Sequence, residues 1–464
     1  MEWRIKLESK TGWGDVTEVE IATLTRHVTA ATDEDVGLTL AESKVILSTI
    51  QRLIVEGQID EYVTCARVCR SCLKLLPIRD RRTRKIQTLF GTVEVHAPRI
   101  RVCACVNHLG LHEVSISSLA ELLPDRCTPE LRRVQAELGA RMSYREAGRI
   151  MASLLPCSPP KHSTISNRLA RVADGLDAGD REMTREPRLP KQVIAKDAAM
   201  GPPVTVILDG AHIRAVPTTQ SRLLDVTVGK VLGADGQSRR FGLALRGAGA
   251  PSVTLRAALV GQGWRPGSAV TVISDGEPAL RNLVKAATGE DVTHILDWWH
   301  LSIRVRHIEQ IVRGMEASET PVHPTILDAA VLAERLRHLL WNGYANEAHR
   351  VIFSLRSRAD AIAEFARPAH RERTRKLCGH CEELATYIEN NEGAIINYSR
   401  RYRSEEPVAS APAEGCVDEI ANVRMAKKRR MRWSPRGAHR VATVRAAMLD
   451  TRLPGQITTN RKAA

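Results

Sequence analysis

Three aspartates at the ends of short elements are the residues of this chain best suited to do chemistry. Asp209 closes the apolar run 204–208 and Asp275 closes the run 270–274, and a glycine follows each of them. Both runs are typical of buried strands whose C-terminal ends present a carboxylate. Asp418 lies in a segment that is predicted to begin a helix. Carboxylates from separate elements repel each other unless cations lie between them, and hard oxygen ligands suit Mg²⁺ or Mn²⁺.

Two such ions, about 3.5–4 Å apart, form the phosphoryl-transfer site of nucleases and polymerases. For a single aspartate there is a simpler interpretation, because Asp-Gly after a strand often marks an ordinary turn. Taken one residue at a time, the turn is the better interpretation. The metal-site prediction therefore depends on the three aspartates meeting in space.

The elements that must position these aspartates are predicted to be α/β. Their order, β-β-β-α-β-α-β, is that of an RNase H-like domain, in which two strands and a later helix supply three acids. Long amphipathic helices fill 301–400. A compact core needs only a short connection at this point, so an all-α insertion is predicted before the helix of Asp418. We expect strands at 204–209, 223–231, 239–245, 270–275 and 294–297, with helices at 253–262 and 278–287.

A cluster of cysteines near the N-terminus indicates a metal site of another kind. Two short pairs flank a segment, 86–102, that alternates and turns at Gly91 as a hairpin would. Four thiolates around β structure are typical of a zinc ribbon, although the second pair has C-x-C spacing instead of C-x₂-C. The alternative is reduced cysteines in a core. The predicted structural Zn²⁺ ligands are Cys69, Cys72, Cys103 and Cys105, with Cys65, His108 and His112 beside them.

Residues 128–175 are predicted to form three short helices. Thr128-Pro129 and Ser143 mark helix starts, and a third helix is expected near Ser163. A polar and basic third helix suits a helix-turn-helix reader of DNA, and a plain three-helix bundle with solvated arginines is an equal alternative. The predicted DNA-contacting residues here are Asn167, Arg168 and Arg171.

Asp297 and His300 are the next candidates for the catalytic site. His300 would lie one helical turn beyond Asp297, close to the predicted metal carboxylates, where it could orient a ligand or contact the scissile phosphate. A capped helix start with a hydrogen-bonded histidine is an equal alternative. Trp298 and Trp299 could stack on an unpaired base, but at least one of them is expected to lie in the core.

The charge of the chain indicates a polyanionic partner. The net charge is +15, and residues 422–464 hold twelve Lys/Arg and one acidic residue, Asp450. This segment is expected to contact phosphates in a sequence-independent, salt-sensitive way, with a solvated basic tail as the alternative. The predicted phosphate contacts are Lys427, Lys428, Arg429, Arg430 and Arg432.

Neither a signal-peptide-like segment nor an apolar run long enough to span a bilayer is evident, so a cytoplasmic protein with reduced cysteines is expected. The predicted fold is an α/β RNase H-like catalytic core with an all-α insertion, preceded by zinc-ribbon-like and helical, helix-turn-helix-like modules. The expected boundaries are a helical scaffold at 1–64, the zinc-ribbon-like module at 65–115, the helical DNA-binding module at 116–176, a linker at 177–203, the core at 204–300, the insertion at 301–410, and the catalytic helix with a basic tail at 411–464.

Several motifs resemble the DDE transposases of bacterial insertion sequences, most closely the Kra-type family, over nearly the whole length. An Asp-x-x-His element after the second acid recurs in transposases with all-α insertions, and Met-Arg-Trp-Ser followed by Gly-Ala is characteristic of this family's C-terminus. The matching segments are both cysteine pairs with 88–93 and Pro98-Arg99 between them, 128–131, 208–210, 274–276, 296–300, Val417-Asp418 and 431–439.

The resemblance implies cleavage of DNA at transposon ends and strand transfer into target DNA. Asp209, Asp275 and Asp418 would hold two Mg²⁺ or Mn²⁺ ions, and the partners would be double-stranded terminal inverted repeats and target DNA. A homo-oligomer on DNA, associated with the bacterial nucleoid, would follow. The family normally has Glu as its third acid, whereas here Asp418 stands at that place and is one methylene shorter. Glu419 is adjacent but about 100° round a regular helix.

Three alternatives stay open. The first is a zinc-ribbon and helix-turn-helix DNA-binding protein that derives from a transposase and is catalytically impaired, which the departure at Asp418 favours. The second is another RNase H-like nuclease, such as a resolvase. The third is a basic structural or RNA-associated protein, in which the three carboxylates need not converge.

Overall fold

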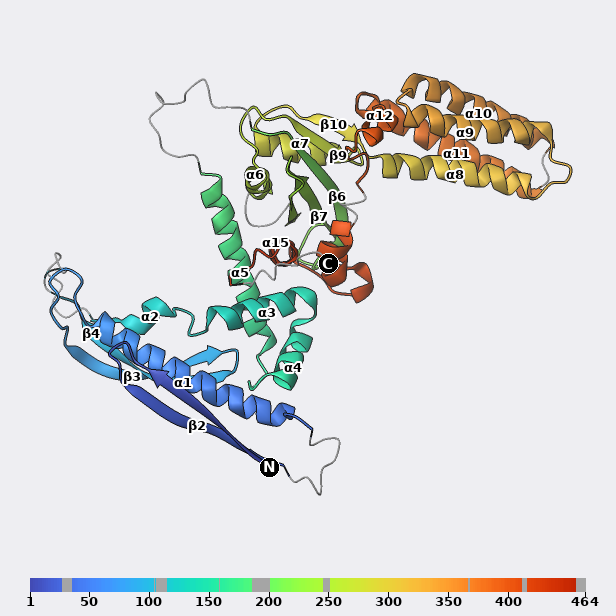
Figure 1. Ribbon diagram of the computed structural model, residues 1–464. Helices are drawn as coiled ribbons and strands as arrows, with labels where there is room; N and C mark the ends of the chain where they lie inside the picture. The colour runs from blue at the N-terminus through green and yellow to red at the C-terminus, as the bar shows by residue number, and fades with distance from the viewer. Residues whose placement is uncertain are drawn as a thin grey trace, which may run out of the picture. The chain divides into compact units, whose positions relative to one another are not determined.

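The computed structural model describes residues 1–26, 36–103, 105, 115–157, 159–185, 201–244, 251–365, 368–410 and 415–455 (Figure 1). The chain divides into two compact units. The first comprises residues 1–172 with 451–464, and the second comprises residues 173–450. Each unit is described by itself.

The first unit begins with an antiparallel hairpin of β1 (Glu2–Lys10) and β2 (Val16–Thr25). The long helix α1 (Leu40–Ala66) follows. Thr39 and Glu42 form a reciprocal capping box at its start, which satisfies backbone N–H groups that the first helical turn leaves free. The predicted helical scaffold at 1–64 thus consists of this hairpin and most of one long helix.

A three-stranded antiparallel sheet follows α1, made of β3 (Ile78–Thr88), β4 (Gly91–Arg101) and β5 (Ser115–Ser117). The tight turn between β3 and β4 ends at Gly91, whose φ of 122° favours glycine. The predicted hairpin is therefore confirmed. One face of α1 packs on this sheet through Val55 and Ile59, which share a core with Ile86 and Val93.

Helices α2 (Ser118–Leu122), α3 (Pro129–Arg141), α4 (Tyr144–Leu154) and α5 (His162–Met183) complete this part of the chain. Thr128 and Ser143 stand at the N-caps of α3 and α4, as predicted. The predicted linker at 177–203 is wrong in its first part, because α5 continues to Met183. The helix continues there because the carboxylates of Asp177 and Asp180 are buried against His439 and Arg239.

The second unit contains a mixed five-stranded sheet in the order β10-β9-β6-β7-β8. Strands β9 and β10 run parallel to β6, whereas β7 and β8 continue from β6 as an antiparallel meander. The elements follow the predicted β-β-β-α-β-α-β order, so the mixed α/β class is confirmed. Their bounds are β6 (Val204–Arg214), β7 (Leu223–Leu232), β8 (Ser238–Ala244), α6 (Pro251–Gly261), β9 (Val270–Ser274), α7 (Pro278–Thr288) and β10 (Thr293–Leu296).

The two faces of this sheet belong to different cores. On one face, Leu208 and Val272 pack with residues of α6 and α7. On the other face, Ile207, Ile273 and Ile295 belong to the core of the helical insertion. Alternating residues of a strand point to opposite faces, so the side of the sheet that faces the insertion is fixed by this apolar pattern.

The insertion is a set of long helices that lie side by side (Figure 1). The predicted all-α content of this region is confirmed. Among the described residues, no helix has both the length and the apolar character of a membrane span. The helices are α8 (Trp298–Glu316), α9 (Pro324–Trp341), α10 (Ala345–Phe365) and α11 (Pro368–Asn391), followed by η4 (Glu392–Ala394) and α12 (Tyr398–Arg403).

The chain returns to the sheet through η5 (Val417–Asn422), a π-helical segment, α14 (Val423–Met425), η6 (Lys427–Arg429) and α15 (Pro435–Leu449). Helix α15 packs on β8, where a Cβ at Gly242 would lie 3.0 Å from that of Ala442. Arg440 pairs with Asp174. This part of the predicted basic tail is therefore a buried, charge-paired helix and neither a solvated tail nor a phosphate surface.

Candidate functional site

Four cysteines of the first unit form the tightest group of ligand atoms in the described part of the chain. Their sulfur atoms all lie within 4.8 Å of one another. Cys69 Sγ is 3.4 Å from Cys105 Sγ, and Cys72 Sγ is 3.5 Å from Cys103 Sγ. A tetrahedral Zn²⁺ with Zn–S bonds of about 2.3 Å places its sulfurs roughly 3.8 Å apart. The predicted convergence of the two pairs is confirmed, and the group could hold a metal ion such as zinc.

Local backbone geometry explains why the first pair converges. After Cys69 the chain makes a narrow turn, in which Leu73 N–H donates to Cys69 O and Leu73 adopts a φ of 58°. Backbone N–H groups of Cys72 and Ser71 donate to the Cys69 sulfur and lower its pKa to about 6. Donors aimed at a sulfur favour the thiolate, the form that binds metals.

The second cysteine pair follows the end of β4, which is paired with the start of β3. Cys103 lies two residues after the end of β4. Arg101 N–H donates to Pro77 O, which ties this end of the strand to the chain after the first pair. Cys65 is exposed and is not a member of the four-sulfur group. His108 and His112 lie outside the described residues.

In the second unit, two adjacent parallel strands bring Asp209 and Asp275 to one face of the sheet. Ile207 on β6 is paired with Ile273 on β9, and both side chains point into the core of the insertion. Side chains alternate along a strand, so Asp209 and Asp275, two residues further along, point to the same face of the sheet as Ile207 and Ile273. Neighbouring strands lie about 4.8 Å apart, so the two carboxylates are close together. Asp275 directly follows β9, as predicted. The prediction that Asp209 ends its strand is wrong, because β6 stays paired with β7 as far as Arg214.

The charge environment of Asp209 shows how closely the acids gather. Partial burial raises its pKa, and the negative charges of Asp275 and Asp297 add to this effect. The Gly210 N–H, which donates to Asp209 Oδ1 at 2.7 Å, and the charge of His300 act in the opposite direction. A carboxylate whose pKa is raised in this way binds a proton or a cation more readily than a solvated carboxylate does.

The turn that carries Asp275 is held from the insertion. Tyr387 of α11 donates its hydroxyl to Asp275 O at 2.7 Å, and Arg304 of α8 lies over the Tyr387 ring at 4.2 Å. Gly276 has a φ of 92°, and a Cβ there would lie 2.5 Å from Asn391 Oδ1. The close approach of α11 therefore requires glycine after Asp275, and the aspartate is held by a helix more than a hundred residues away in sequence.

Asp297 is the N-cap of α8 and is completely buried. Its Oδ1 accepts from Trp299 N–H at 2.9 Å and from Ser410 N–H at 2.8 Å, and its Oδ2 accepts from the Ser410 hydroxyl. Both carboxylate oxygens of Asp297 therefore accept hydrogen bonds, as the alternative of a capped helix start predicted. Asp297 contributes negative charge to the site, and its hydrogen bonds hold the first turn of α8 in place.

His300 lies in that first turn, with its Nε2 3.6 Å from Asp297 Oδ2 and without a hydrogen-bond partner among the described residues. Its charge acts on Asp209, which places it beside the carboxylates as predicted. Trp298 packs against Trp341 and Tyr398 in the insertion core, whereas Trp299 is 39% exposed. The expectation that at least one of the two tryptophans is a core residue is confirmed.

Asp418 lies in the π-helical segment η5, which packs against β6 and β7. Its carboxylate is exposed and accepts from Asn422 Nδ2 at 2.7 Å. The neighbouring Glu419 pairs with Arg240 of β8 at 3.3 Å, and its backbone O accepts from the buried Arg445. Glu419 is therefore held by Arg240 of the sheet. Of these two acidic residues, Asp418 has the carboxylate that can bind a ligand.

The three carboxylates do not form a group as compact as the cysteines. Among the described residues, the four sulfurs form the only group of potential metal ligands with all atoms within 4.8 Å of one another. The oxygens of Asp209, Asp275 and Asp418 are therefore spread more widely than the ligand shell of one ion.

The residues of the helical module that are predicted to contact DNA differ in exposure and in their partners. Asn167 is exposed. Arg168 is only 9% exposed, and its guanidinium donates to Gln87 and Gln135. The prediction of a DNA contact at Arg168 is wrong, because this side chain links β3 to α3 inside the unit. Arg171 is exposed and paired with Asp125.

The basic run before α15 is exposed at Lys428, Arg429, Arg430 and Arg432, as a phosphate-contacting surface requires. The side chain of Lys427 lies outside the described residues. This run leads into Trp433, whose backbone is paired with the end of β6.

Sequence reasoning missed several residues around the carboxylates. Tyr387, Asn391 and Arg304 lie on amphipathic helices, where apolar spacing gave no sign that they reach the sheet. Ser410 lies in a loop, and its sequence context gave no sign that it contacts Asp297. Glu277 is the exception, since an acid two residues after Asp275 was visible in the sequence. Burial raises its pKa, and the charges of Asp275 and Asp225 reinforce the effect.

Comparison of the chain with protein-family models and with curated proteins found no match.

Proposed function

We propose that the protein is a DNA transposase, which cleaves DNA at the ends of an insertion sequence and transfers the strands into target DNA in a metal-dependent reaction. The observation that supports this most directly is the position of Asp209 on β6 and of Asp275 just after the adjacent parallel strand β9, with the segment of Asp418 packed on β6. The resemblance of the sequence motifs to DDE transposases supports the same function.

We further propose that the sheet is the core of an RNase H-like domain. Two features support this fold. The strands and helices follow the expected order, and the third acid returns to the sheet after a long all-α insertion. The first and fourth strands would supply two acids and the helical segment η5 the third, in agreement with the resemblance.

The donor set suits a pair of Mg²⁺ or Mn²⁺ ions. Carboxylate oxygens are the preferred ligands of these hard cations, and Asp209, Asp275 and Asp418 would hold them. Two ions about 3.5–4 Å apart need ligands spread over a wider area than one ion does, which suits three carboxylates that are less compact than a single coordination shell. Bound there, the ions would activate the attacking oxygen and stabilise the leaving oxygen of an in-line displacement.

The protein side chains around the acids have separate tasks in this proposal. Asp297 and Ser410 fix the first turn of α8, which aims His300 at the scissile phosphate. Protonated His300 would stabilise the negative charge that grows on the phosphate oxygens. Tyr387 and Asn391 hold the Asp275 turn. No serine or tyrosine is required as a covalent nucleophile.

For the first unit we propose a structural Zn²⁺ held by the four cysteines. The site is closed, with four protein ligands and none left for a substrate, as is usual for structural zinc. In this proposal the ion fixes the end of the β3–β4 hairpin to the turn after α1. The module would then present a rigid DNA-binding surface that includes Asn167.

Nicking of DNA tests the proposal. Full-length protein would be mixed with a supercoiled plasmid that carries the gene with its native flanking DNA, in Mg²⁺ or Mn²⁺. We expect Asp209→Asn to lower the nicking rate by about 10³-fold or more. Asp291→Asn is the matched control, because Asp291 is 94% exposed and pairs only with Lys285 among the described residues. Equal rates for both variants would refute a catalytic role of the acid.

A second function is favoured by one observation. The carboxylates are spread, and the third acid is the shorter Asp418, so a DNA-binding protein that has lost transposase activity is the rival proposal. It predicts that wild-type protein binds the flanking DNA but nicks it no faster than Asp209→Asn does. Strand-transfer products from wild-type protein would exclude this rival and would also exclude a simple nuclease.

A further inference from the structure

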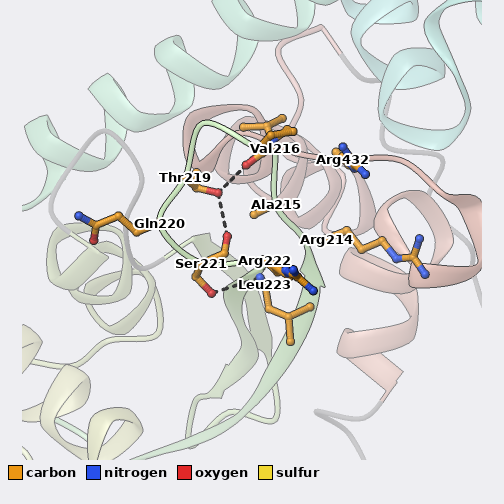
Figure 2. A pocket seen from close by; sticks show the side chains of 10 residues that line it. Arg214, Ala215, Val216, Thr219, Gln220, Ser221, Arg222, Leu223 and Arg432 are labelled. Atoms are coloured by element: carbon orange, nitrogen blue, oxygen red, sulfur yellow. Dashed lines mark hydrogen bonds between the residues drawn. The ribbon is translucent and has the colours of Figure 1, made fainter.

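The turn between β6 and β7 forms one side of a pocket of about 750 Å³. Figure 2 shows Arg214, Arg222 and Arg432 on one side of this turn and Gln220 on the other. Arg432 comes from the basic run before α15, more than two hundred residues later in the chain. The pocket is lined by Arg214, Ala215, Val216, Pro217, Thr219, Gln220, Ser221, Arg222, Leu223 and Arg432.

The three arginines give the pocket a positive charge that no neighbour neutralises. All three are exposed, and none of their guanidinium groups has an ion-pair or hydrogen-bond partner in the described part of the chain. Within the described ranges of the chain, no acidic residue lines the pocket. Other arginines of this unit are paired, such as Arg239 with Asp180 and Arg240 with Asp450. Three unpaired positive charges therefore line one hollow, where they can surround a ligand.

The backbone holds Arg432 at this pocket. Its neighbour Trp433 donates N–H to Arg214 O at 2.9 Å and accepts from Val216 N–H at 3.0 Å, so the segment pairs with the end of β6 like a short strand. Trp433 is 6% exposed, with Arg424 over its ring at 4.9 Å. Arg432 is thus anchored by a buried neighbour.

The turn itself is also internally bonded. The hydroxyl of Thr219 donates to Val216 O and to Ser221 O, and Ser221 Oγ accepts from Leu223 N–H at 3.2 Å. These bonds hold the positions of Arg214 and Arg222 without using their side chains. A site whose backbone is already ordered binds its ligand at a lower entropic cost.

We propose that this pocket binds phosphate groups of the DNA backbone. Planar guanidinium groups match phosphate oxygens through paired N–H donors, and a hollow with three of them and no acid selects an anion. This proposal adds a phosphate-binding site to the proposed transposase. It rests on that function for the path of the DNA strand past the carboxylates. The pocket would hold DNA that leads away from the carboxylates, as a sequence-independent contact.

Strand β6 sets the distance between the two places. Asp209 and Arg214 lie five residues apart on this one strand, which corresponds to about 17 Å. One strand of B-DNA advances about 3.4 Å per nucleotide. The odd spacing of Asp209 and Arg214 turns the two side chains to opposite faces of the strand. A phosphate in the pocket would therefore lie at least roughly five nucleotides from a scissile phosphate at Asp209.

The first experiment measures binding alone. Full-length protein would be titrated against a fluorescent 30-base-pair duplex of arbitrary sequence at several KCl concentrations. The test variant carries Arg214→Gln, Arg222→Gln and Arg432→Gln. The control carries Arg306→Gln, Arg335→Gln and Arg337→Gln, which remove the same charge from exposed positions on α8 and α9.

We expect the test variant to bind at least about 30-fold more weakly than the control near 100 mM salt, with the slope of log K against log salt smaller by about 2–3. Equal affinities and slopes for the two variants would overturn the proposal. Two competitors identify the source of the phosphate. Inorganic phosphate or ADP displacing the duplex at micromolar concentration, or single-stranded RNA binding more tightly with the same arginine dependence, would each overturn the assignment to DNA.

The second experiment places the contact. Once the nick is mapped, single phosphates of the substrate would be made neutral as methylphosphonates, one position at a time. We expect wild-type binding to weaken at a phosphate at least about five nucleotides from the nick, and the affinity of the triple arginine variant to be unchanged by the same replacement. If wild-type and variant respond alike at every position, the pocket does not hold the strand. Absence of nicking refutes the catalytic proposal and leaves the first experiment valid.

Discussion

The cysteine group and the carboxylate group are assembled in different ways. The four sulfurs come from two short pairs at neighbouring ends of one turn and one hairpin, and all lie within 4.8 Å of one another. The carboxylates come from two strands and a segment that returns after a long insertion, and they are less compact. Local backbone geometry accounts for the first site, whereas packing across the whole second unit accounts for the other.

The difference shows where each site should be vulnerable. A site formed by a turn and a hairpin depends on its own ligands, because few other elements hold it. A site formed by distant elements depends on residues that hold its carboxylates and helix ends in place from other parts of the chain, such as Asp297 and Tyr387. Substitutions in the two regions should therefore separate the two kinds of dependence.

The largest expected effect concerns the zinc ion that we propose at the cysteine group. We expect Cys72→Ser to weaken zinc binding by at least about 100-fold and to lower the thermal stability of the first unit, because structural zinc contributes directly to folding. Zinc content by atomic spectroscopy and a thermal melt would be measured. Cys65→Ser is the control, since that exposed thiol is outside the group. One zinc per chain in both variants would contradict the assignment.

The second effect concerns the buried cap of α8. We expect Asp297→Ala to lower the free energy of unfolding by about 3–5 kcal/mol, because it leaves the Ser410 groups buried without an acceptor. Asp297→Asn keeps an oxygen for the backbone donors and should cost about 1 kcal/mol. Urea unfolding followed by circular dichroism would measure both. Should Asp297→Asn abolish nicking at unchanged stability, the carboxylate takes part in the chemistry instead.

The third effect is smaller and tests the support of Asp275 from the insertion. Tyr387→Phe removes one hydrogen bond, worth about 0.5–1.5 kcal/mol, and we expect nicking to slow by roughly 3- to 10-fold with DNA affinity unchanged. Tyr402→Phe is the control, because Tyr402 is 65% exposed. A loss of affinity at an unchanged nicking rate would show that Tyr387 contacts DNA and does not position the turn.

The smallest effect tests the third acid. We expect Asp418→Glu to raise the nicking rate, by less than about 10-fold, because the added methylene lengthens the reach of the carboxylate while Asn422 can still donate to it. Glu419→Gln should leave the rate nearly unchanged, since it removes only the pair with Arg240. The opposite ranking of the two variants would mean that the π-helical turn presents Glu419 to the substrate.

Sequence alone determined the parts of this protein that depend on local patterns. The β-branched runs before Asp209 and Asp275 predicted two strands, of which β9 ends before Asp275 as expected and β6 continues past Asp209 to Arg214. The cysteine pairs predicted the four-sulfur group. These patterns are informative because alternation reports which side of a strand is apolar, and because the predicted hairpin returns the second cysteine pair to the first.

Tertiary structure decided which charged residues remain available. Arg168 and Arg171 look alike in the sequence, but only the fold shows that Arg168 is buried between Gln87 and Gln135. His439 pairs with Asp177, 262 residues away. The pocket of Arg214 and Arg432 likewise unites a hairpin with a distant segment. Periodicity along a chain identifies buried faces, but the partner of a charge is set by long-range packing, which no local pattern contains.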